Sequence, residues 1–319
     1  MTSSTVPRPA AVAAVSSRRR ALRLVAIAAC LPYLSLKVAW ISGSHLGIPD
    51  GSPLLEQRLT MALANGLTVL MDAAVVVLAL LLTRPWGVRV PAWLLAVPMW
   101  IATGLLAPIM VGFPLQLLLN RGGGGGGDKP FLDGWVFALV YGGFIVQGLA
   151  LGTLFAGYAR TRWGRLWRGR VRELPARAGA SAQRLTAVTV MFLGLAAGAV
   201  RLLWACGVTA GRSGGGDRLM EAVYVLFLAA AVTGAGQLAF HRGRSLPVAV
   251  PLALAWVGSG AVACWGGWTA LATLVTAHTL ADRPTPLLSL TYAVQMIVGF
   301  LVASLTAHFL AERSVKAPR

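Results

Sequence analysis

Three ionisable side chains lie within apolar segments of this chain: Lys37, Asp72 and Arg201. A charge inside a bilayer is costly in free energy, so each is a candidate for binding a solute, an ion or a proton. If the helices that carry Lys37 and Asp72 form a hairpin, the two groups differ in depth by about 9 Å, a gap that a lysine side chain can largely bridge. In the second half of the chain, Glu221 is placed to meet Arg201.

The same positions also have purely structural interpretations. Lys37 and Arg201 can extend to the outer headgroups, with Trp40 and Trp204 in the interfacial region, or they can form buried ion pairs. Asp72 is too short to reach a headgroup from the middle of a helix. Its alternatives are a proton- or cation-linked role and a buried structural pair, and the sequence leaves both open.

Two glutamines, Gln147 and Gln295, each follow a valine within an apolar segment, one in each half of the chain. Side-chain amides hydrogen-bond between helices in membranes, so helix packing is one role for them. A shared polar site in the centre of the bundle is the other. Together with the three ionisable residues, they form the candidate substrate or ion site.

Catalytic and metal-binding motifs do not accompany these residues. The chain has no HExxH, and the Gly-Ser-Gly run at 258–260 lacks the spacing of a nucleophile elbow. The pairs His45 with Asp50 and His278 with Asp282 match no strong metal-ligand spacing. We therefore expect no enzyme activity, no catalytic residue, no metal and no cofactor.

The composition determines the class of protein that must position these groups. The chain has 319 residues, of which 57% are apolar and 12% are charged, against about 45–50% and about 25% in ordinary soluble domains. Such a chain cannot bury its apolar surface in one water-soluble core, and it is too hydrophobic for a disordered polycation. It is predicted to be a polytopic membrane protein.

Eight apolar stretches are long enough to span a bilayer as helices. They lack the alternation typical of a membrane barrel, so the predicted fold is all-α. The predicted spans are 21–42, 61–83, 91–113, 134–158, 185–207, 219–240, 249–273 and 287–310.

The net charge of +18 is distributed in a way that indicates orientation. Twenty of the 28 lysines and arginines fall at the chain ends or in alternate connections, six fall in the other connections, and two fall within spans. Positive residues are retained on the cytoplasmic side. The distribution predicts a protein of the cell membrane with both termini in the cytoplasm.

The two halves of the chain match each other at several positions. Each has a cation three residues before a tryptophan, Lys37 with Trp40 and Arg201 with Trp204, and each has a Val-Gln pair in its fourth span. This predicts two parallel four-helix repeats, a plan that some transporters use. The expected organisation is a basic tail (1–20), repeat 1 (21–158), an Arg-rich linker (159–184), repeat 2 (185–310) and a second tail (311–319).

The linker between the repeats has an apolar stripe at helical spacing, from Trp163 through Trp167 to Leu174, with arginines on its other faces. This pattern is typical of an amphipathic helix on a membrane surface. The expected contacts with anionic lipids of the cytoplasmic face involve Trp163, Arg165, Trp167, Arg168 and Arg172. No nucleic-acid-binding module is present, so the basic charge does not indicate a nucleic-acid partner.

The segment from Pro32 to Trp40, with the pattern PYxxLKxxW, resembles the first helix of a group of uncharacterised multi-pass membrane proteins from high-GC bacteria. The resemblance covers one helix and implies no activity. From the residues alone we expect a transporter-like protein that binds or moves a small molecule or lipid at the interface between the repeats. The alternative is an accessory or sensory protein that binds partners through its outer loops and the Arg-rich linker.

Overall fold

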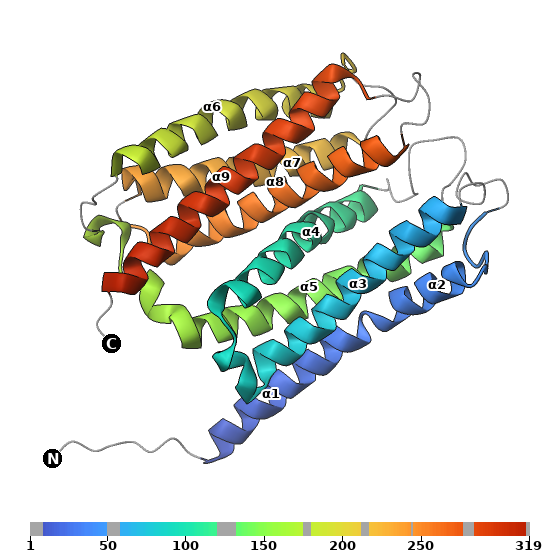
Figure 1. The fold of residues 1–319 in the computed structure, drawn as a ribbon, viewed down its shortest axis with the longest axis horizontal. Helices are drawn as coiled ribbons and strands as arrows, with labels where there is room; N and C mark the ends of the chain where they lie inside the picture. The colour runs from blue at the N-terminus through green and yellow to red at the C-terminus, as the bar shows by residue number, and fades with distance from the viewer. Residues whose placement is uncertain are drawn as a thin grey trace. The chain divides into compact units, whose positions relative to one another are not determined.

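The computed structural model describes residues 9–49, 58–119, 132–174, 180–211, 217–243, 245–276 and 284–316. Within these ranges the regular structure is helical, with no strand beyond one isolated bridge between Arg170 and Pro247 (Figure 1). Eight segments are long and apolar enough to cross a membrane. The predicted all-α fold with eight helices of spanning length is confirmed.

The chain divides into two compact units. Unit 1 comprises Met1–Met99 and Phe131–Arg162, and unit 2 comprises Trp100–Pro130 and Trp163–Arg319. One boundary, between Met99 and Trp100, falls within a helix, and another, between Arg162 and Trp163, falls at the end of a helix.

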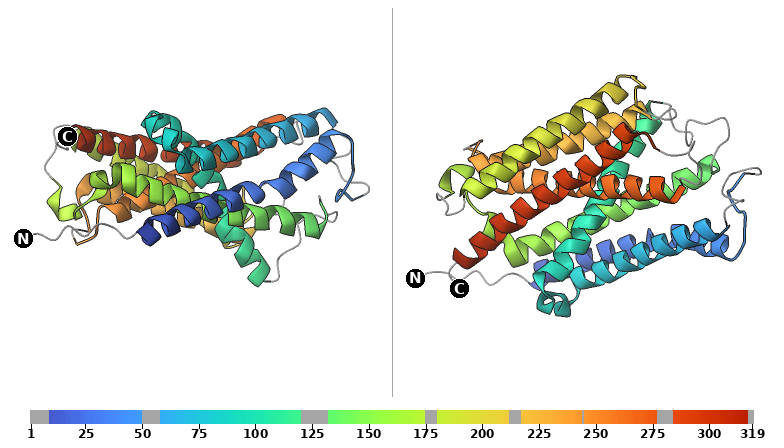
Figure 2. Two further views of the ribbon diagram at one scale, coloured as in Figure 1. Left: turned by 90° about the horizontal axis from the view of Figure 1, so that it is seen from below. Right: turned by 45° about the horizontal axis from the view of Figure 1, so that its top comes forward.

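Unit 1 contains the first helices of the chain, and α3 packs against both α1 and α2 (Figure 2). Its elements are α1 (Pro9–Ala28), α2 (Leu31–Ile41), α3 (Arg58–Thr83), the 3-10 turn η2 (Pro85–Arg89), the first residues of α4 (Ala92–Leu118), and α5 (Gly134–Trp163) up to Arg162.

Unit 2 contains the rest of α4 and four long helices, of which α7–α8 and α8–α9 are the most extensive neighbours. These are α6 (Ala180–Ala205), α7 (Arg218–Phe240), α8 (Ala249–Thr276) and α9 (Pro286–Lys316), preceded by the 3-10 turns η3 (Gly164–Trp167) and η4 (Val171–Glu173). Figure 2 shows α6, α7 and α9 running side by side.

The first spanning segment is interrupted, which the sequence analysis did not anticipate. α1 ends at Ala28 and α2 begins at Leu31, with Pro32 in its first turn. A proline has no backbone N–H, and its ring clashes with the carbonyl four residues earlier, which is that of Ala28. The helix is therefore interrupted at Ala28, the residue whose carbonyl the Pro32 ring would otherwise contact.

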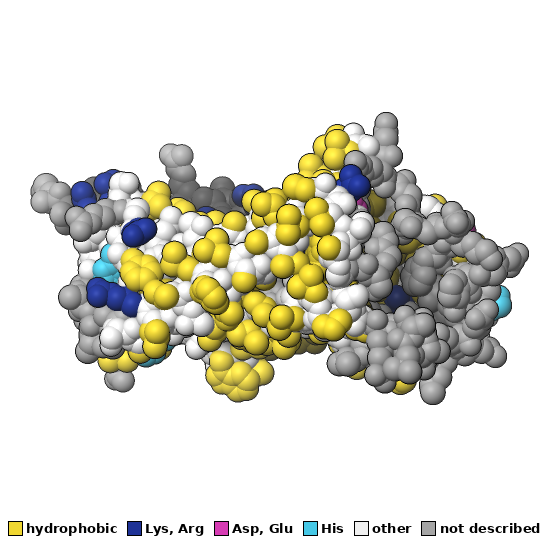
Figure 3. Space-filling model, turned by 90° about the horizontal axis from the view of Figure 1, so that it is seen from above, with side chains coloured by type: hydrophobic (Ala, Val, Ile, Leu, Met, Phe, Trp, Pro, Cys, Tyr) yellow, Lys and Arg dark blue, Asp and Glu magenta, His cyan; other side chains and the backbone are white. Residues whose placement is uncertain are grey.

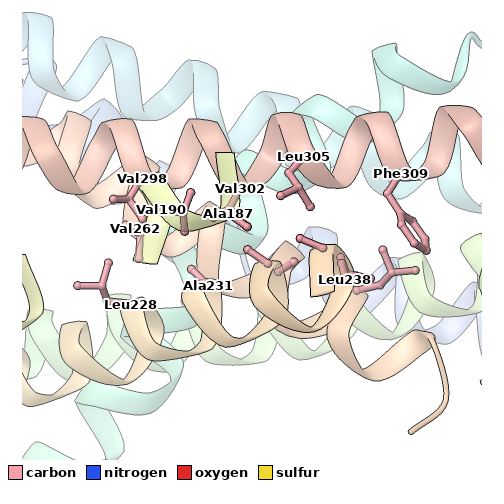
Figure 4. Close-up of a cluster of buried hydrophobic side chains, with 14 of the residues drawn as sticks. Ala187, Val190, Leu228, Ala231, Leu238, Val262, Val298, Val302, Leu305 and Phe309 are labelled. Carbon is pink, nitrogen blue, oxygen red and sulfur yellow. The ribbon is translucent and has the colours of Figure 1, made fainter. Parts of the chain in front are cut away.

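The core of unit 2 is built from small and branched side chains that allow close helix contact (Figure 4). A Cβ on Gly258 would lie 2.8 Å from the Phe227 carbonyl oxygen and equally close to the Ala231 Cα, so α7 and α8 are nearly in backbone contact. Val298, Val302 and Phe309 of α9 are fully buried in the same cluster. Small residues permit such packing in membrane helices, where no hydrophobic effect drives helices together.

The outer surface of unit 2 is apolar along much of α6. Phe192 is 73% exposed, and Leu185 and Leu195 are each 69% exposed. Figure 3 shows hydrophobic side chains across the middle of the face on this side, with lysine or arginine toward its ends. A wide apolar band bounded by cations is the surface expected of a helix that meets lipid.

The linker between the predicted repeats is not a single amphipathic helix, so this prediction is wrong for residues 163–174. α5 ends at Trp163, and η3 and η4 follow with Gly169 between them in a left-handed conformation, φ +89°. Val171 and Leu174 are buried in the core of unit 2. Hydrogen bonds from Val171 N to Leu246 O and from Val248 N to Gly169 O join the segment to the start of α8. Tertiary contact overrides the local helical pattern.

Candidate functional site

Unit 2 contains a buried cation that is paired directly with an acid. Arg201 of α6 is 2% exposed. Its Nη1 lies 2.7 Å from the Glu221 carboxylate of α7, and its Nε donates to Gln295 Oε1 of α9 at 2.9 Å. The guanidinium also lies over the Tyr224 ring at 4.5 Å and the Tyr292 ring at 5.4 Å. The predicted contact between Arg201 and Glu221 is confirmed.

This arrangement neutralises a charge that would otherwise be costly. A buried ion pair is tolerated when its members are hydrogen-bonded and close. Glu221 is positioned at the start of α7, where Asp217 caps the helix by accepting from Leu219 N at 2.9 Å. Three helices therefore meet on the Arg201 guanidinium.

Lys37 is the corresponding cation of unit 1, and it has a neutral partner. Its Nζ donates to Asn65 Oδ1 of α3 at 2.7 Å. It lies 4.7 Å from the centre of the Tyr33 ring and 4.9 Å from that of Trp40. These cation–π contacts hold the ammonium between two rings of its own helix. The lysine is held by Asn65 rather than by a direct ion pair with Asp72.

Asp72 is also buried, at 4% exposed, and interacts with a different helix. The Gln147 side chain of α5, 1% exposed, acts on this carboxylate as a hydrogen-bond donor. Asp72 Oδ2, Gln147 Oε1 and Asn65 Nδ2 have no hydrogen-bond partner among the described residues. Most buried polar atoms in proteins are paired, so three unpaired ones in one unit call for a physical explanation.

The residues of the two units share a further local structure beyond the matched cations. Trp40 Nε1 donates to Leu46 O at 2.8 Å, and Trp204 Nε1 donates to Ala210 O at 3.2 Å, each six residues ahead. Left-handed glycines follow each tryptophan by three and seven residues. They are Gly43 and Gly47 in unit 1, with φ of +94° and +73°, and Gly207 and Gly211 in unit 2, with φ of +97° and +72°.

A reciprocal contact links α4 and α8 within unit 2. Trp100 Nε1 of α4 donates to Ser259 Oγ at 2.9 Å, and Trp256 Nε1 of α8 donates to Thr103 Oγ1 at 3.4 Å. Each tryptophan thus reaches the hydroxyl three positions beyond the other one. Such an exchange is what two equivalent helices make across a local two-fold axis.

The helices cross at glycines placed one residue after those hydroxyls. A Cβ added to Gly104 would overlap the Gly260 carbonyl oxygen, and one added to Gly260 would lie 3.0 Å from the Trp100 carbonyl oxygen. The pattern Trp-x2-Thr/Ser-Gly therefore describes both sides of one crossing.

The five predicted site residues fall into two clusters. Lys37, Asp72 and Gln147 belong to unit 1, and Arg201 and Gln295 belong to unit 2. Asn65 was not among the residues predicted from the sequence, although it precedes Asp72 by seven residues and therefore lies on the same helix face.

The basic residues of the linker have mixed surroundings. Arg165, Arg168 and Arg172 are exposed, whereas Trp163 and Trp167 are partly buried. Trp167 packs against the apolar core of unit 2. Arg172 Nε lies 3.7 Å from the Glu173 carboxylate.

The described residues contain no group of three or more potential metal ligands. His45 is described and exposed, whereas Asp50, His278 and Asp282 lie outside the described residues. Comparison of the chain with protein-family models, with curated proteins and with solved structures found no match. The candidate site is therefore the basis for the proposed function.

Proposed function

We propose that this protein is a transporter-like, non-enzymatic membrane protein that binds a small polar molecule or a lipid headgroup through the cluster of unit 1. The observation that carries the proposal is the set of three unpaired polar atoms on Asn65, Asp72 and Gln147, all more than nine-tenths buried. Unpaired buried polar groups are costly in free energy unless a bound group satisfies them.

The unit 1 cluster offers both signs of charge to such a molecule. Lys37 and Asn65 Nδ2 are donors, and Asp72 Oδ2 and Gln147 Oε1 are acceptors. In unit 2 the equivalent cation is already neutralised by Glu221. The proposal therefore places binding in unit 1, rather than at the repeat interface that the sequence suggested.

We also propose that the chain consists of two parallel four-helix repeats. The support is threefold: the same tryptophan-glycine geometry after α2 and after α6, the buried glutamines of α5 and α9, and the reciprocal contact of α4 with α8. Parallel repeats are found in some transporters. On this proposal one repeat retains a binding cluster and the other has a closed ion pair.

The proposed location is the cell membrane, with both termini in the cytoplasm. The support is the positive-inside distribution of lysine and arginine. Cysteine-scanning with a membrane-impermeant thiol reagent tests it: in a variant without the exposed native Cys206, a cysteine introduced at Ser314 is predicted to react only after the membrane is opened. Reaction in intact cells would contradict the orientation.

Binding is tested on purified protein in lipid nanodiscs with a panel of labelled amino acids, quaternary amines, sugars and short-chain lipids. At least one compound is expected to bind saturably, and Asn65→Leu and Asp72→Asn are each expected to weaken it at least about tenfold, equivalent to about 1.4 kcal/mol. Thr153→Val is the matched control, because Thr153 is exposed and its hydroxyl donates to Leu149 O of its own helix.

Two results would contradict this function. One is that no compound of the panel binds to the folded protein. The other is that binding is unchanged in both cluster variants. A compound that passes the binding test is then tested for uptake into proteoliposomes, which separates a transporter from a receptor.

A second candidate function rests on the exposed arginines at Arg165, Arg168 and Arg172. Because η4 and Leu174 anchor this segment to the core of unit 2, it presents the arginines from a fixed backbone. We propose that they bind anionic lipid, and in an accessory or sensory role a protein partner. The triple change to glutamine is expected to remove co-purified anionic lipid in native mass spectrometry. Unchanged lipid retention would contradict this role.

A further inference from the structure

Two of the unpaired atoms in unit 1 are acceptors on facing side chains. Gln147 acts as a donor toward the Asp72 carboxylate, and both Gln147 Oε1 and Asp72 Oδ2 have no partner among the described residues. Two acceptors cannot satisfy each other. An ionised carboxylate here would leave a charge with one unsatisfied oxygen at a buried position.

A single proton removes this conflict. A protonated carboxyl group has one O–H donor in addition to its acceptor oxygen. A proton on Asp72 Oδ2 can be donated to Gln147 Oε1 while the Gln147 amide donates to the other carboxyl oxygen. Acid and amide then form two hydrogen bonds in opposite directions, and no unpaired acceptor remains on either side chain.

We propose that Asp72 and Gln147 form a proton-binding site within the membrane, in which a proton on the Asp72 carboxyl group is shared by hydrogen bonding with Gln147. The chemical change is the addition of one proton to the carboxylate, without any other bond being made or broken. The site rests on the same cluster as the proposed function, and the proton and a solute are alternative partners for the same two acceptor oxygens.

The cation and the titratable groups that act on Asp72 are themselves held by other residues. Lys37 acts on it electrostatically, but the ammonium is hydrogen-bonded to Asn65 and lies between two aromatic rings. From the start of α2, Cys30 and Tyr33 also interact with the Asp72 charge, and the Tyr33 side chain is hydrogen-bonded to Thr68.

Three other titratable groups on the helices around Asp72 make contacts elsewhere. Arg23 of α1 donates to Thr83 at the end of α3. From α5, Tyr141 interacts with Tyr33, and Arg162 donates to Val90 O beyond η2. None of these interactions supplies a proton donor to Asp72 Oδ2.

Unit 2 shows why only one such site is inferred. With Arg58-Leu59 aligned on Arg218-Leu219, the position of Asp72 corresponds to Val232. The glutamine equivalent to Gln147 is Gln295, whose Oε1 accepts from Arg201 instead of facing an acid. The acidic partner and the unpaired carbonyl oxygen therefore occur together in unit 1 alone, among the described residues.

Infrared spectroscopy of the protein in lipid nanodiscs tests the site directly, because a protonated carboxyl group has a C=O stretching band that an ionised one lacks. A band sensitive to D2O is expected in mildly acidic buffer and is expected to be lost in Asp72→Asn. In Gln147→Leu it is expected to persist at a shifted frequency, since the acid loses its hydrogen-bond partner. Asp217→Asn is the control, because Asn also caps a helix well, and it is expected to leave the band unchanged.

Absence of a band that depends on Asp72 in mildly acidic buffer would overturn the inference. An unshifted band in Gln147→Leu would overturn the shared hydrogen bond. If Asp72→Asn does not fold, the Gln147→Leu spectrum still decides, as does labelling of wild-type Asp72 by a hydrophobic carbodiimide, which reacts with protonated carboxyl groups in lipid. Solute binding without the band would leave the proposed function standing and reject the proton site. The band without solute binding would leave the proton site standing and reject the proposed function.

Discussion

Each unit has a cation three residues before a tryptophan, part-buried Lys37 in unit 1 and buried Arg201 in unit 2, and the two cations have different partners. In unit 2, Arg201 is held by an acid, an amide and aromatic rings. In unit 1, Lys37 is held by Asn65 and two rings, and the acid of the same unit, Asp72, faces Gln147. The difference teaches that a matched cation does not by itself make a site. What differs is the acid: Glu221 pairs directly with the cation, whereas Asp72 does not, and each cluster also has an unpaired glutamine atom, Gln147 Oε1 in unit 1 and Gln295 Nε2 in unit 2.

The largest expected effect comes from breaking the closed cluster of unit 2. Glu221→Gln leaves Arg201 buried without its counter-charge, and removal of one member of a buried pair typically costs about 3–5 kcal/mol of stability. Asp72→Asn in unit 1 is expected to change stability far less, because a protonated acid and an amide are nearly isosteric. Both are measured by equilibrium unfolding in mixed detergent micelles. A larger loss in Asp72→Asn would reverse the comparison.

A double variant separates the loss of the Glu221 charge from the loss of its packing. The double variant Arg201→Met with Glu221→Leu removes both charges together, and apolar replacement of a buried pair is often neutral. It is expected to recover most of the stability lost in Glu221→Gln. If it does not, the contribution of Glu221 is steric rather than electrostatic.

The next effect concerns the α4–α8 crossing. Gly104→Ala places a methyl group against the Gly260 carbonyl, and overpacking of this kind costs about 1–3 kcal/mol. Gly152→Ala on α5 is the matched control, since a Cβ there meets nothing within 4 Å. It is expected to be neutral or slightly stabilising, because alanine is the better helix former. Thermal unfolding of the two variants compares them, and equal melting temperatures would contradict the close crossing.

An effect of similar size is expected from Lys37→Met. The variant removes one hydrogen bond to a charged group and leaves only the neutral Asn65 without it, so the expected loss is about 1–3 kcal/mol. Arg201→Met is expected to be more harmful, because it leaves the buried Glu221 carboxylate without its cation. Side-by-side unfolding curves measure the ranking. If Lys37→Met were the more harmful change, Lys37 would be balancing a charge in unit 1.

The smallest effect is expected from the reciprocal tryptophan bonds. Ser259→Ala removes the partner of Trp100 and is expected to cost about 1 kcal/mol, as for an average hydrogen bond. Thr103→Val is expected to cost less, because its bond to Trp256 is longer, at 3.4 Å against 2.9 Å. The shift of tryptophan fluorescence on substitution provides a second measurement. If neither the stability nor the fluorescence changes, these hydrogen bonds do not stabilise the α4–α8 crossing.

Particular residues show which contacts could be predicted from the sequence and which could not. The match of Lys37-Val38-Ala39-Trp40 with Arg201-Leu202-Leu203-Trp204 indicated equivalent positions, and Glu221 was correctly expected to contact Arg201. The same reasoning did not find Asn65, because a pattern of helix faces does not specify which of several polar residues a flexible lysine reaches. It also assigned Val171 and Leu174 to a membrane-surface helix, although they are buried in unit 2.

The sequence by itself determined the class of protein, the number of long apolar helices and the positions of the buried charges. It could do so because a backbone in lipid must satisfy its own hydrogen bonds, so a long apolar run has few structures available to it. Only the tertiary structure decided that Lys37 contacts Asn65, that Asp72 faces Gln147, and that Trp100 and Trp256 exchange hydroxyl partners. Those contacts depend on the rotation and depth of each helix against its neighbours, which a local sequence pattern does not specify.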